Sequence, residues 1–231
     1  MPGRPRLQLL ILVVTLAATA FTLAACGGDD GAGDTASTGD GATTADAAEG
    51  CRAVQQPEPR RVKERKRPSF RLARDKTYSA KIETSCGDFT IRLDSQRAPR
   101  TGGSFVTLAR DDFYDGLSFH RIVPGFVIQG GDPNGDGTGD AGYKVRERPP
   151  SDIVYSEGVV AMAKGGAEPG GTSGSQFFVV TATDSGLEPD YALLGEVTSG
   201  LDVVQIIGRV PTNADQPLAP VVIDDVKIEV K

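Results

Sequence analysis

From residue 76 onward, apolar residues occur in short runs whose spacing predicts strands. Residues 78–84 and 89–93 alternate between apolar and polar side chains, with Cys86, Gly87 and Asp88 between them, so we predict a hairpin. Clusters of Gly, Pro, Asn and Asp separate the other short apolar runs, which cover residues 126–128, 158–163, 176–180, 191–197 and 221–230. This pattern is typical of a β-rich domain.

Two segments have helical spacing instead. Residues 98–110 have Pro99 near their start and Phe105, Val106 and Leu108 on one face, and residues 202–207 fit a second, shorter helix. Many short strands with one early and one late helix predict a mainly β fold. We expect a β-barrel with helical plugs.

The first 25 residues have the pattern of a secretory signal peptide. Arg4 and Arg6 precede an apolar run that ends in small residues and Cys26. Residues 23–26, Leu-Ala-Ala-Cys, resemble the lipobox of bacterial lipoproteins, in which the cysteine is acylated and becomes the first mature residue. This resemblance implies lipidation at Cys26, with an uncleaved N-terminal anchor as the alternative.

Residues 26–76 form a predicted tether and connector. Residues 27–50 are almost entirely Gly, Ala, Asp, Thr and Ser, which bury too little apolar surface to order a chain, so we expect disorder. Residues 60–67 form a basic cluster between prolines. We interpret this cluster as a connector lying on the acidic domain, with contact to an anionic lipid or envelope polymer as the alternative.

Composition excludes several classes of site. The 231-residue chain has one His, three Cys, no Trp and a net charge of −6, so a zinc ribbon and a multi-His metal site are excluded. If Cys26 is lipidated, Cys51 and Cys86 remain as a pair that export would oxidise. We expect a Cys51–Cys86 disulfide, with two free structural thiols as the alternative.

Two long segments carry a family resemblance. Residues 119–132, Phe-His-Arg-Ile-Val-Pro-Gly-Phe-Val-Ile-Gln-Gly-Gly-Asp, resemble the signature of the cyclophilin peptidyl-prolyl cis-trans isomerases. Residues 174–178, Gly-Ser-Gln-Phe-Phe, resemble a second family segment, and residues 158–163 also fit. The resemblance spans about residues 77–231 and implies the cyclophilin fold, a closed antiparallel eight-stranded β-barrel capped by two helices. It also implies rotamase activity.

The chemistry of this reaction needs few groups. Rotation about an X–Pro amide has a barrier of about 18–20 kcal/mol because it breaks resonance. A cation that donates to the proline nitrogen stabilises the twisted state, an apolar pocket holds the ring, and no cofactor or metal is required. By resemblance, Arg121 is the cation, and Gln129 and His120 act beside it. The resemblance assigns substrate binding to Phe126, Val127, Ala163, Lys164, Gln176, Phe178, Leu187 and Tyr191.

The chain departs from the family pattern at the edge of the pocket. Lys164 replaces the usual Asn, Tyr191 replaces the common His, and Gly186 stands nearest to where a Trp is often found. Residues 165–173 form a loop about three residues longer than the commonest form. Without the Trp, the resemblance does not extend to tight cyclosporin binding, whereas the residues expected to act in isomerisation are all present.

Two other motifs are set aside. Residues 132–140 match the start of a calcium-binding EF-hand loop, but the closing Glu would fall at Tyr143 and no helix pattern precedes the loop. Residues 171–175 resemble a nucleophile elbow, but Ser175 occupies the position of the second Gly. We interpret both as surface turns.

The sequence therefore predicts an exported peptidyl-prolyl isomerase that assists protein folding. We expect it to be a monomer, held by its lipid on the extracytoplasmic face of the cell membrane, with proline-containing polypeptides as partners and no nucleic acid bound. The alternative is a non-catalytic chaperone module that binds proline peptides in the same groove.

Overall fold

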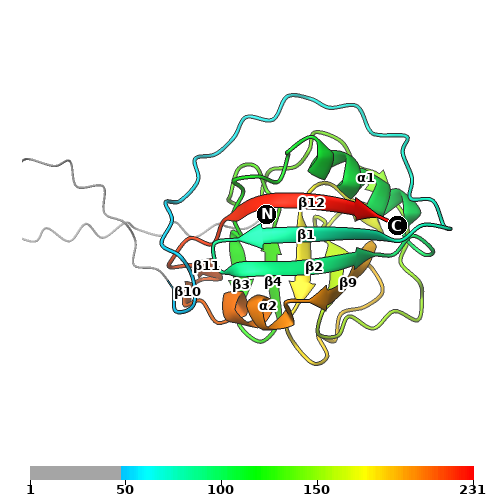
Figure 1. Cartoon of the computed structure of the whole chain (residues 1–231). Helices are drawn as coiled ribbons and strands as arrows, with labels where there is room; N and C mark the ends of the chain where they lie inside the picture. The colour runs from blue at the N-terminus through cyan, green and yellow to red at the C-terminus, as the bar shows by residue number, and fades with distance from the viewer. Residues whose placement is uncertain (1–47) are drawn as a thin grey trace, which may run out of the picture. The chain divides into compact units, whose positions relative to one another are not determined.

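The computed structural model describes residues 48–231; the predicted signal peptide, Cys26 and most of the predicted tether lie outside this range. Figure 1 shows a strand-rich domain with two helices. In chain order, its elements are β1 (Tyr78–Thr84), β2 (Gly87–Leu93), α1 (Pro99–Arg110), β3 (Arg121–Val123), β4 (Val127–Gly130), β5 (Val145–Arg146), β6 (Val159–Met162), β7 (Thr172–Ser173), β8 (Phe177–Val180), β9 (Leu193–Ser199), α2 (Leu201–Gly208), β10 (Thr212–Asn213), β11 (Gln216–Pro217) and β12 (Ile223–Val230). Within residues 48–231, no helix has both the length and the apolar character needed to cross a bilayer.

Eight strands form one antiparallel sheet in the order β12-β1-β2-β9-β6-β8-β4-β3. The strand number agrees with the prediction, but the expected closed barrel is wrong, because β3 and β12 are not paired with each other. β3 has only three residues. The segment before β3 instead bonds to the chain around the start of β12: Gly116 N–H donates to Ile223 O at 2.7 Å and Phe119 N–H to Val221 O at 2.9 Å. The sheet is therefore curled, and the ladder between β3 and β12 is replaced by these bonds and by one bridge between Ser118 and Val222.

The β1–β2 hairpin follows directly from its alternating sequence. Every second residue of β1 is buried, including Ala80 and Ile82, because alternate side chains of a strand point to the same face. The register pairs Tyr78 with Leu93 and Thr84 with Gly87. The turn is formed by residues 85–86, one residue earlier than predicted.

Both predicted helices are present. Ala98 is the N-cap of α1, and Pro99 occupies the first turn, where its missing N–H costs no helical hydrogen bond. Phe105, Val106 and Leu108 on the apolar face are fully or almost fully buried. α2 extends the predicted segment by one residue at each end.

The buried side chains form two clusters. The larger lies between the sheet and α1, where Phe105, Tyr114, Phe119 and Phe177 contact one another through their rings. The smaller is built around Phe178 and neighbouring buried residues of β4, β6 and β8. The smaller cluster forms the apolar base of the candidate site.

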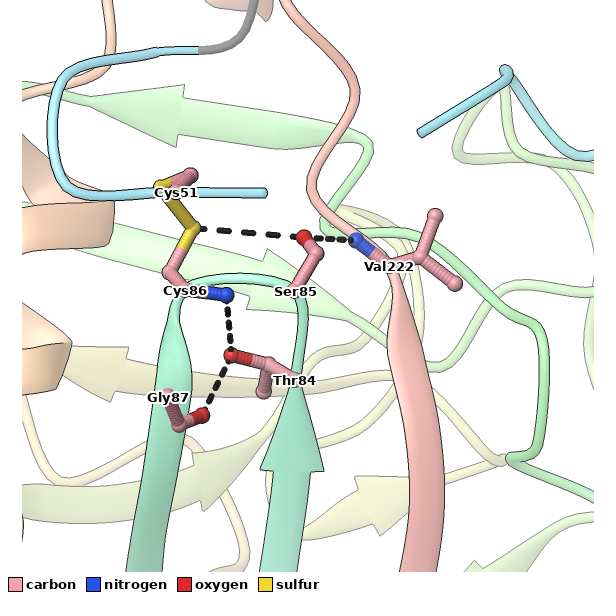
Figure 2. The surroundings of a disulfide bond; sticks show 6 residues. All are labelled: Cys51, Thr84, Ser85, Cys86, Gly87 and Val222. Carbon is pink, nitrogen blue, oxygen red and sulfur yellow. Dashed lines mark hydrogen bonds between the residues drawn. A yellow bond between two sulfur atoms is a disulfide. The ribbon is translucent and has the colours of Figure 1, made fainter. Parts of the chain in front are cut away.

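The described part of the connector, residues 48–76, contacts the domain along its length. It has no helix or strand, and Figure 1 shows it curving around the outside of the domain before β1. A disulfide joins Cys51 to Cys86, the pair expected from the sequence (Figure 2). The N–H of Arg52 donates to Ser85 O at 2.7 Å. Further along, the N–H of Arg60 donates to Pro133 O at 2.8 Å, and Leu72 is buried. The boundary at residues 76–77 remains a prediction.

Candidate active site

The β3–β4 hairpin brings the first two candidate residues together. Arg121 and Gln129 are cross-strand partners, and Gly125 takes the positive φ of 68° in the turn between the strands. Nη1 of Arg121 lies 3.4 Å from Oε1 of Gln129. The guanidinium is therefore held at one edge of the sheet with part of its surface open to solvent.

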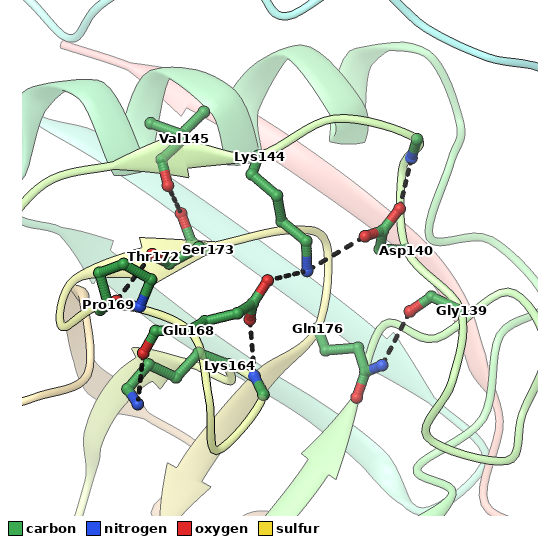
Figure 3. A network of polar contacts seen from close by, with 12 residues as sticks. Gly139, Asp140, Lys144, Val145, Lys164, Glu168, Pro169, Thr172, Ser173 and Gln176 are labelled. Carbon is green, nitrogen blue, oxygen red and sulfur yellow. Dashed lines mark hydrogen bonds and ion pairs between the residues drawn. The ribbon is translucent and has the colours of Figure 1, made fainter.

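A chain of amide contacts holds Gln129 in place. Its Nε2 donates to Oε1 of Gln176 at 2.8 Å, and Nε2 of Gln176 donates to the carbonyl oxygens of Gly137 and Gly139 at 3.0 and 2.8 Å. Figure 3 shows the contact between Gln176 and Gly139. Because these contacts use the amide N–H groups, the carbonyl oxygen of Gln129 faces Arg121.

The loop at residues 132–143 supplies those carbonyl oxygens and is organised by Asp132. This buried carboxylate accepts N–H bonds from Asn134, Asp136 and Gly137 at 2.8, 3.1 and 2.5 Å. The segment that resembled a calcium loop therefore has its first carboxylate bonded to its own backbone. Among residues 48–231, no group of three or more His, Cys, Asp or Glu side chains is placed to hold a metal ion.

A cavity of about 170 Å³ lies beside Arg121. The structure brings nine of the eleven candidate catalytic and substrate-binding residues to its wall. The other two, His120 and Gln176, do not line it, and Gln176 lines the adjoining cavity described below. The lining residues are Arg121, Phe126, Val127, Gln129, Ala163, Lys164, Phe178, Leu187 and Tyr191. The cavity combines the polar side chains of Arg121, Gln129 and Lys164 with the apolar or aromatic side chains of the other six lining residues.

Aromatic rings form one side of this cavity. The ring of Phe178 meets that of Tyr191 edge to face, with 5.3 Å between centroids, and Tyr155 lies behind both at 6.4 and 6.1 Å. The Tyr155 hydroxyl donates to the backbone oxygen of Tyr191. Burial raises the pKa of Tyr155 to about 12, so the hydroxyl remains a donor at neutral pH. The sequence analysis missed Tyr155. This residue lies outside the two family motifs, residues 119–132 and 174–178, and packs behind the aromatic side of the cavity.

Lys164, which stands in place of the usual Asn, folds back onto its own loop. Its Nζ lies 2.7 Å from Oδ2 of Asp190, donates to Glu168 O at 3.2 Å (Figure 3) and lies 5.6 Å from the ring centroid of Tyr191. The hydrogen bond to Asp190 raises the pKa of Lys164. The ammonium group is therefore paired rather than projecting freely into the cavity.

A second cavity of about 250 Å³ adjoins the first, with Gln129, Ala163 and Lys164 lining both. Lys144 lies on its wall, with its Nζ 3.1 Å from both Asp140 and Glu168, as Figure 3 shows. The sequence analysis did not identify this cavity, because its walls come from two loops far apart in the chain.

Asp215 is another residue that the sequence analysis missed. It lies in the turn between β10 and β11 with a positive φ of 67°, and its Oδ2 is 3.1 Å from Nη2 of Arg121. Both side chains are more than a third exposed, so water weakens the pair. The guanidinium thus keeps a carboxylate neighbour without being buried by it.

His120 is buried behind Arg121 and does not line the cavity. Neither ring nitrogen has a hydrogen-bond partner among residues 48–231. Burial lowers the pKa of His120, and the carboxylates of Asp132 and Asp136 oppose this shift only in part. The lowered pKa keeps the imidazole neutral at neutral pH.

Because His120 is the single His of the chain, its titration can be followed without assignment. We expect NMR of the full-length chain to give an imidazole pKa below about 6.5, the ordinary value. Unfolding restores the ordinary pKa of the imidazole. At pH values between the folded and the unfolded pKa, the unfolded chain therefore binds more protons than the folded chain. The free energy of unfolding should therefore fall as pH drops through that interval. An imidazole that titrates at or above 6.5 would contradict the buried placement.

A preorganised cation beside an apolar pocket, with amide groups fixed around it, suits the binding and twisting of a proline amide. The fold and site thus define a class of protein: a β-sheet isomerase for X–Pro bonds. A family model described as cyclophilin type peptidyl-prolyl cis-trans isomerase/CLD matches residues 79–228. The chain belongs to this family and is a peptidyl-prolyl cis-trans isomerase.

Individual relatives agree with this assignment. Peptidyl-prolyl cis-trans isomerase B of Streptomyces anulatus is 38% identical over 172 residues, which cover 66% of this chain and 97% of the relative. The human peptidyl-prolyl cis-trans isomerase-like 1 is 40% identical over 152 residues, covering 64% and 87%. A crystal structure of a Cryptosporidium parvum cyclophilin type isomerase, in the presence of the dipeptide Ala-Pro, matches with a TM-score of 0.61 and 29% identity, covering 65% of this chain and 98% of that one.

Proposed function

We propose that this isomerase is a lipoprotein that acts outside the cytoplasm, where it speeds slow proline steps in folding polypeptides. The placement of nine of the expected residues around one cavity, with Arg121 among them, supports the assignment of its active site. The Ala-Pro dipeptide crystallised with the Cryptosporidium relative supports an X–Pro segment as the ligand.

In the proposed mechanism, the proline ring enters the cavity against Phe126, Phe178 and Leu187. The neighbouring backbone is held by Gln129 and by the chain at residues 163–164. As the amide twists, resonance is lost and the lone pair returns to the proline nitrogen. An N–H of Arg121 donates to that lone pair, an interaction that is stronger in the twisted state than in either planar state.

The geometry suits Arg121 for this role. The guanidinium stays charged at any physiological pH and is oriented by Gln129 on one side and Asp215 on the other. Since the donor is already in place, it need not reorganise when the amide twists. His120, behind it, contributes packing and no proton transfer.

The proposed location follows from the N-terminal segment and the cysteines. The signal-like residues 1–25 and the lipobox-like residues 23–26 indicate export and acylation. The Cys51–Cys86 disulfide supports an oxidising compartment, because cytosolic thiols are kept reduced. Two or more acyl chains on Cys26 would anchor the chain stably. The expectation of a monomer remains a prediction.

Metabolic labelling with palmitate tests the anchor. We expect label in the wild-type chain expressed in a bacterium and its complete loss in Cys26→Ala. The matched control is Cys51→Ala with Cys86→Ala, which removes the other two cysteines and should retain the label. Label that persists in Cys26→Ala, or that is absent from the wild type, would contradict the lipoprotein proposal.

A further inference from the structure

A cavity of about 380 Å³ lies between the connector and the domain, with none of its lining residues shared with the proline cavity. Residues 67–71 of the connector form one wall. Arg100 of α1 and the two residues of β5, Val145 and Arg146, complete the lining. The cavity thus exists only where the connector is docked on the domain.

Four arginines line this cavity: Arg67, Arg71, Arg100 and Arg146. None of them forms an ion pair with a carboxylate among residues 48–231. In contrast, two other connector arginines are paired, Arg52 with Asp224 and Arg65 with Asp111. All four are exposed, and Nε of Arg146 donates to Gly170 O at 3.3 Å. The cavity therefore gathers four positive charges that have no carboxylate partner in the described part of the chain.

The carboxylate next to Arg146 in sequence is already occupied. Oε2 of Glu147 accepts the backbone N–H groups of Arg100 and Thr101, at 2.9 and 2.8 Å. Glu147 thereby caps the N-terminus of α1, a position where a negative charge is favourable. Glu147 therefore contacts the backbone of α1, and it forms no ion pair with any of the four arginines.

The connector wall is held firmly enough to preform the cavity. Phe70 packs under the guanidinium of Arg110, whose Cζ lies 5.7 Å from the ring centroid. The backbone oxygen of Phe70 approaches α1 so closely that a Cβ at Gly103 would overlap it. Leu72 is buried, and its N–H donates to Pro99 O at 3.0 Å. The chain on both sides of Arg71 is therefore fixed against the start of α1.

We propose that this cavity, which we call the arginine cavity, binds a phosphoryl oxyanion. Guanidinium groups donate in planar forks that match phosphate oxygens, and a multiply charged tetrahedral anion can accept from several forks at once. A single carboxylate would leave most of the four groups unpaired. The bound anion would join the connector, α1 and β5, and so hold the connector on the domain.

Isothermal titration of the full-length chain with inorganic pyrophosphate at low ionic strength tests the proposal. We expect one saturable site in the wild type. Replacing Arg71 and Arg146 together by Gln should weaken binding by about tenfold or more, because each removes a charge-assisted contact. The matched control is Arg61→Gln with Lys63→Gln, which removes the same charge from exposed connector residues outside the cavity and should leave the affinity within about twofold.

A second arm distinguishes a free phosphate from a lipid headgroup. Vesicles containing phosphatidylglycerol are compared with pure phosphatidylcholine vesicles, which account for insertion of the apolar N-terminal segment. If the Arg71/Arg146 variant loses the phosphatidylglycerol-dependent binding and the Arg61/Lys63 variant keeps it, a lipid headgroup supplies the phosphoryl group, even if pyrophosphate does not bind. Binding of neither probe, or equal loss in both variants, would overturn the arginine cavity as a site. Unchanged isomerase activity in both variants shows that each is folded.

Discussion

Arg121→Ala is expected to lower kcat/KM for X–Pro isomerisation by about 100- to 1,000-fold, the usual cost of removing one preorganised donor from a developing charge. The side chain is part of the cavity wall, and its partners Gln129 and Asp215 are half-exposed or exposed, so its loss should leave the fold intact. Arg121→Lys keeps the charge but not the fork and should be intermediate. A protease-coupled proline peptide assay on the full-length chain measures the effect.

The matched control for this prediction is Arg92→Ala. Arg92 is an exposed arginine on β2 whose guanidinium lies 3.5 Å from Glu196, and it does not line the proline cavity. Its replacement should leave kcat/KM within about twofold, since exposed ion pairs contribute little. If Arg121→Ala retained wild-type kcat/KM while remaining folded, the proposed role of Arg121 would be wrong.

Phe177→Ala is expected to lower the free energy of unfolding by about 3–5 kcal/mol, the usual cost of truncating a fully buried Phe. Its ring is 0% exposed and lies 5.8 Å from Phe105, 5.8 Å from Tyr114 and 6.0 Å from Phe119, centroid to centroid. Urea denaturation of the full-length chain measures the change. Truncation leaves a cavity that these neighbouring rings can fill only in part.

The adjacent Phe178 provides the comparison, because successive strand residues point to opposite faces. Its ring faces the proline cavity and Tyr191 rather than the main core. Phe178→Ala should raise KM for a proline peptide and cost less stability than Phe177→Ala. A larger loss of stability in Phe178→Ala would show that the two faces of β8 are assigned wrongly.

The pattern of apolar and polar residues was sufficient to predict the elements whose structure depends on residues close together in the chain. Alternation predicted the β1–β2 hairpin and helical spacing predicted α1. The residues that meet at the cavity were predicted from the family resemblance, which is carried by several separate segments, among them residues 119–132, 158–163 and 174–178. The hairpin and the helix depend on spacing of two to four residues, and the site prediction depends on contiguous motifs. The predicted turn began one residue later than the observed turn at residues 85–86, because a Gly at position 87 is compatible with the turn or with the start of β2.

The features missed by sequence analysis all depend on contacts between distant segments. Asp215 reaches Arg121 only because the β10–β11 turn lies beside β3, and Tyr155 supports Tyr191 from 36 residues away. The replacement of a ladder between β3 and β12 depends on how the segment at residues 116–119 pairs with residues near the start of β12. None of these long-range contacts leaves a periodic signal in the chain.

The most direct test of the account is exchange NMR on a peptide with one Ala–Pro bond, mixed with a small amount of the full-length chain. Uncatalysed, the cis and trans forms interchange over tens to hundreds of seconds. We predict that the chain produces exchange between their signals on a far shorter timescale, and that Arg121→Ala still binds the peptide but loses most of this exchange. A wild-type chain that binds the peptide and leaves its isomerisation uncatalysed would contradict the account and favour a proline-binding module without activity.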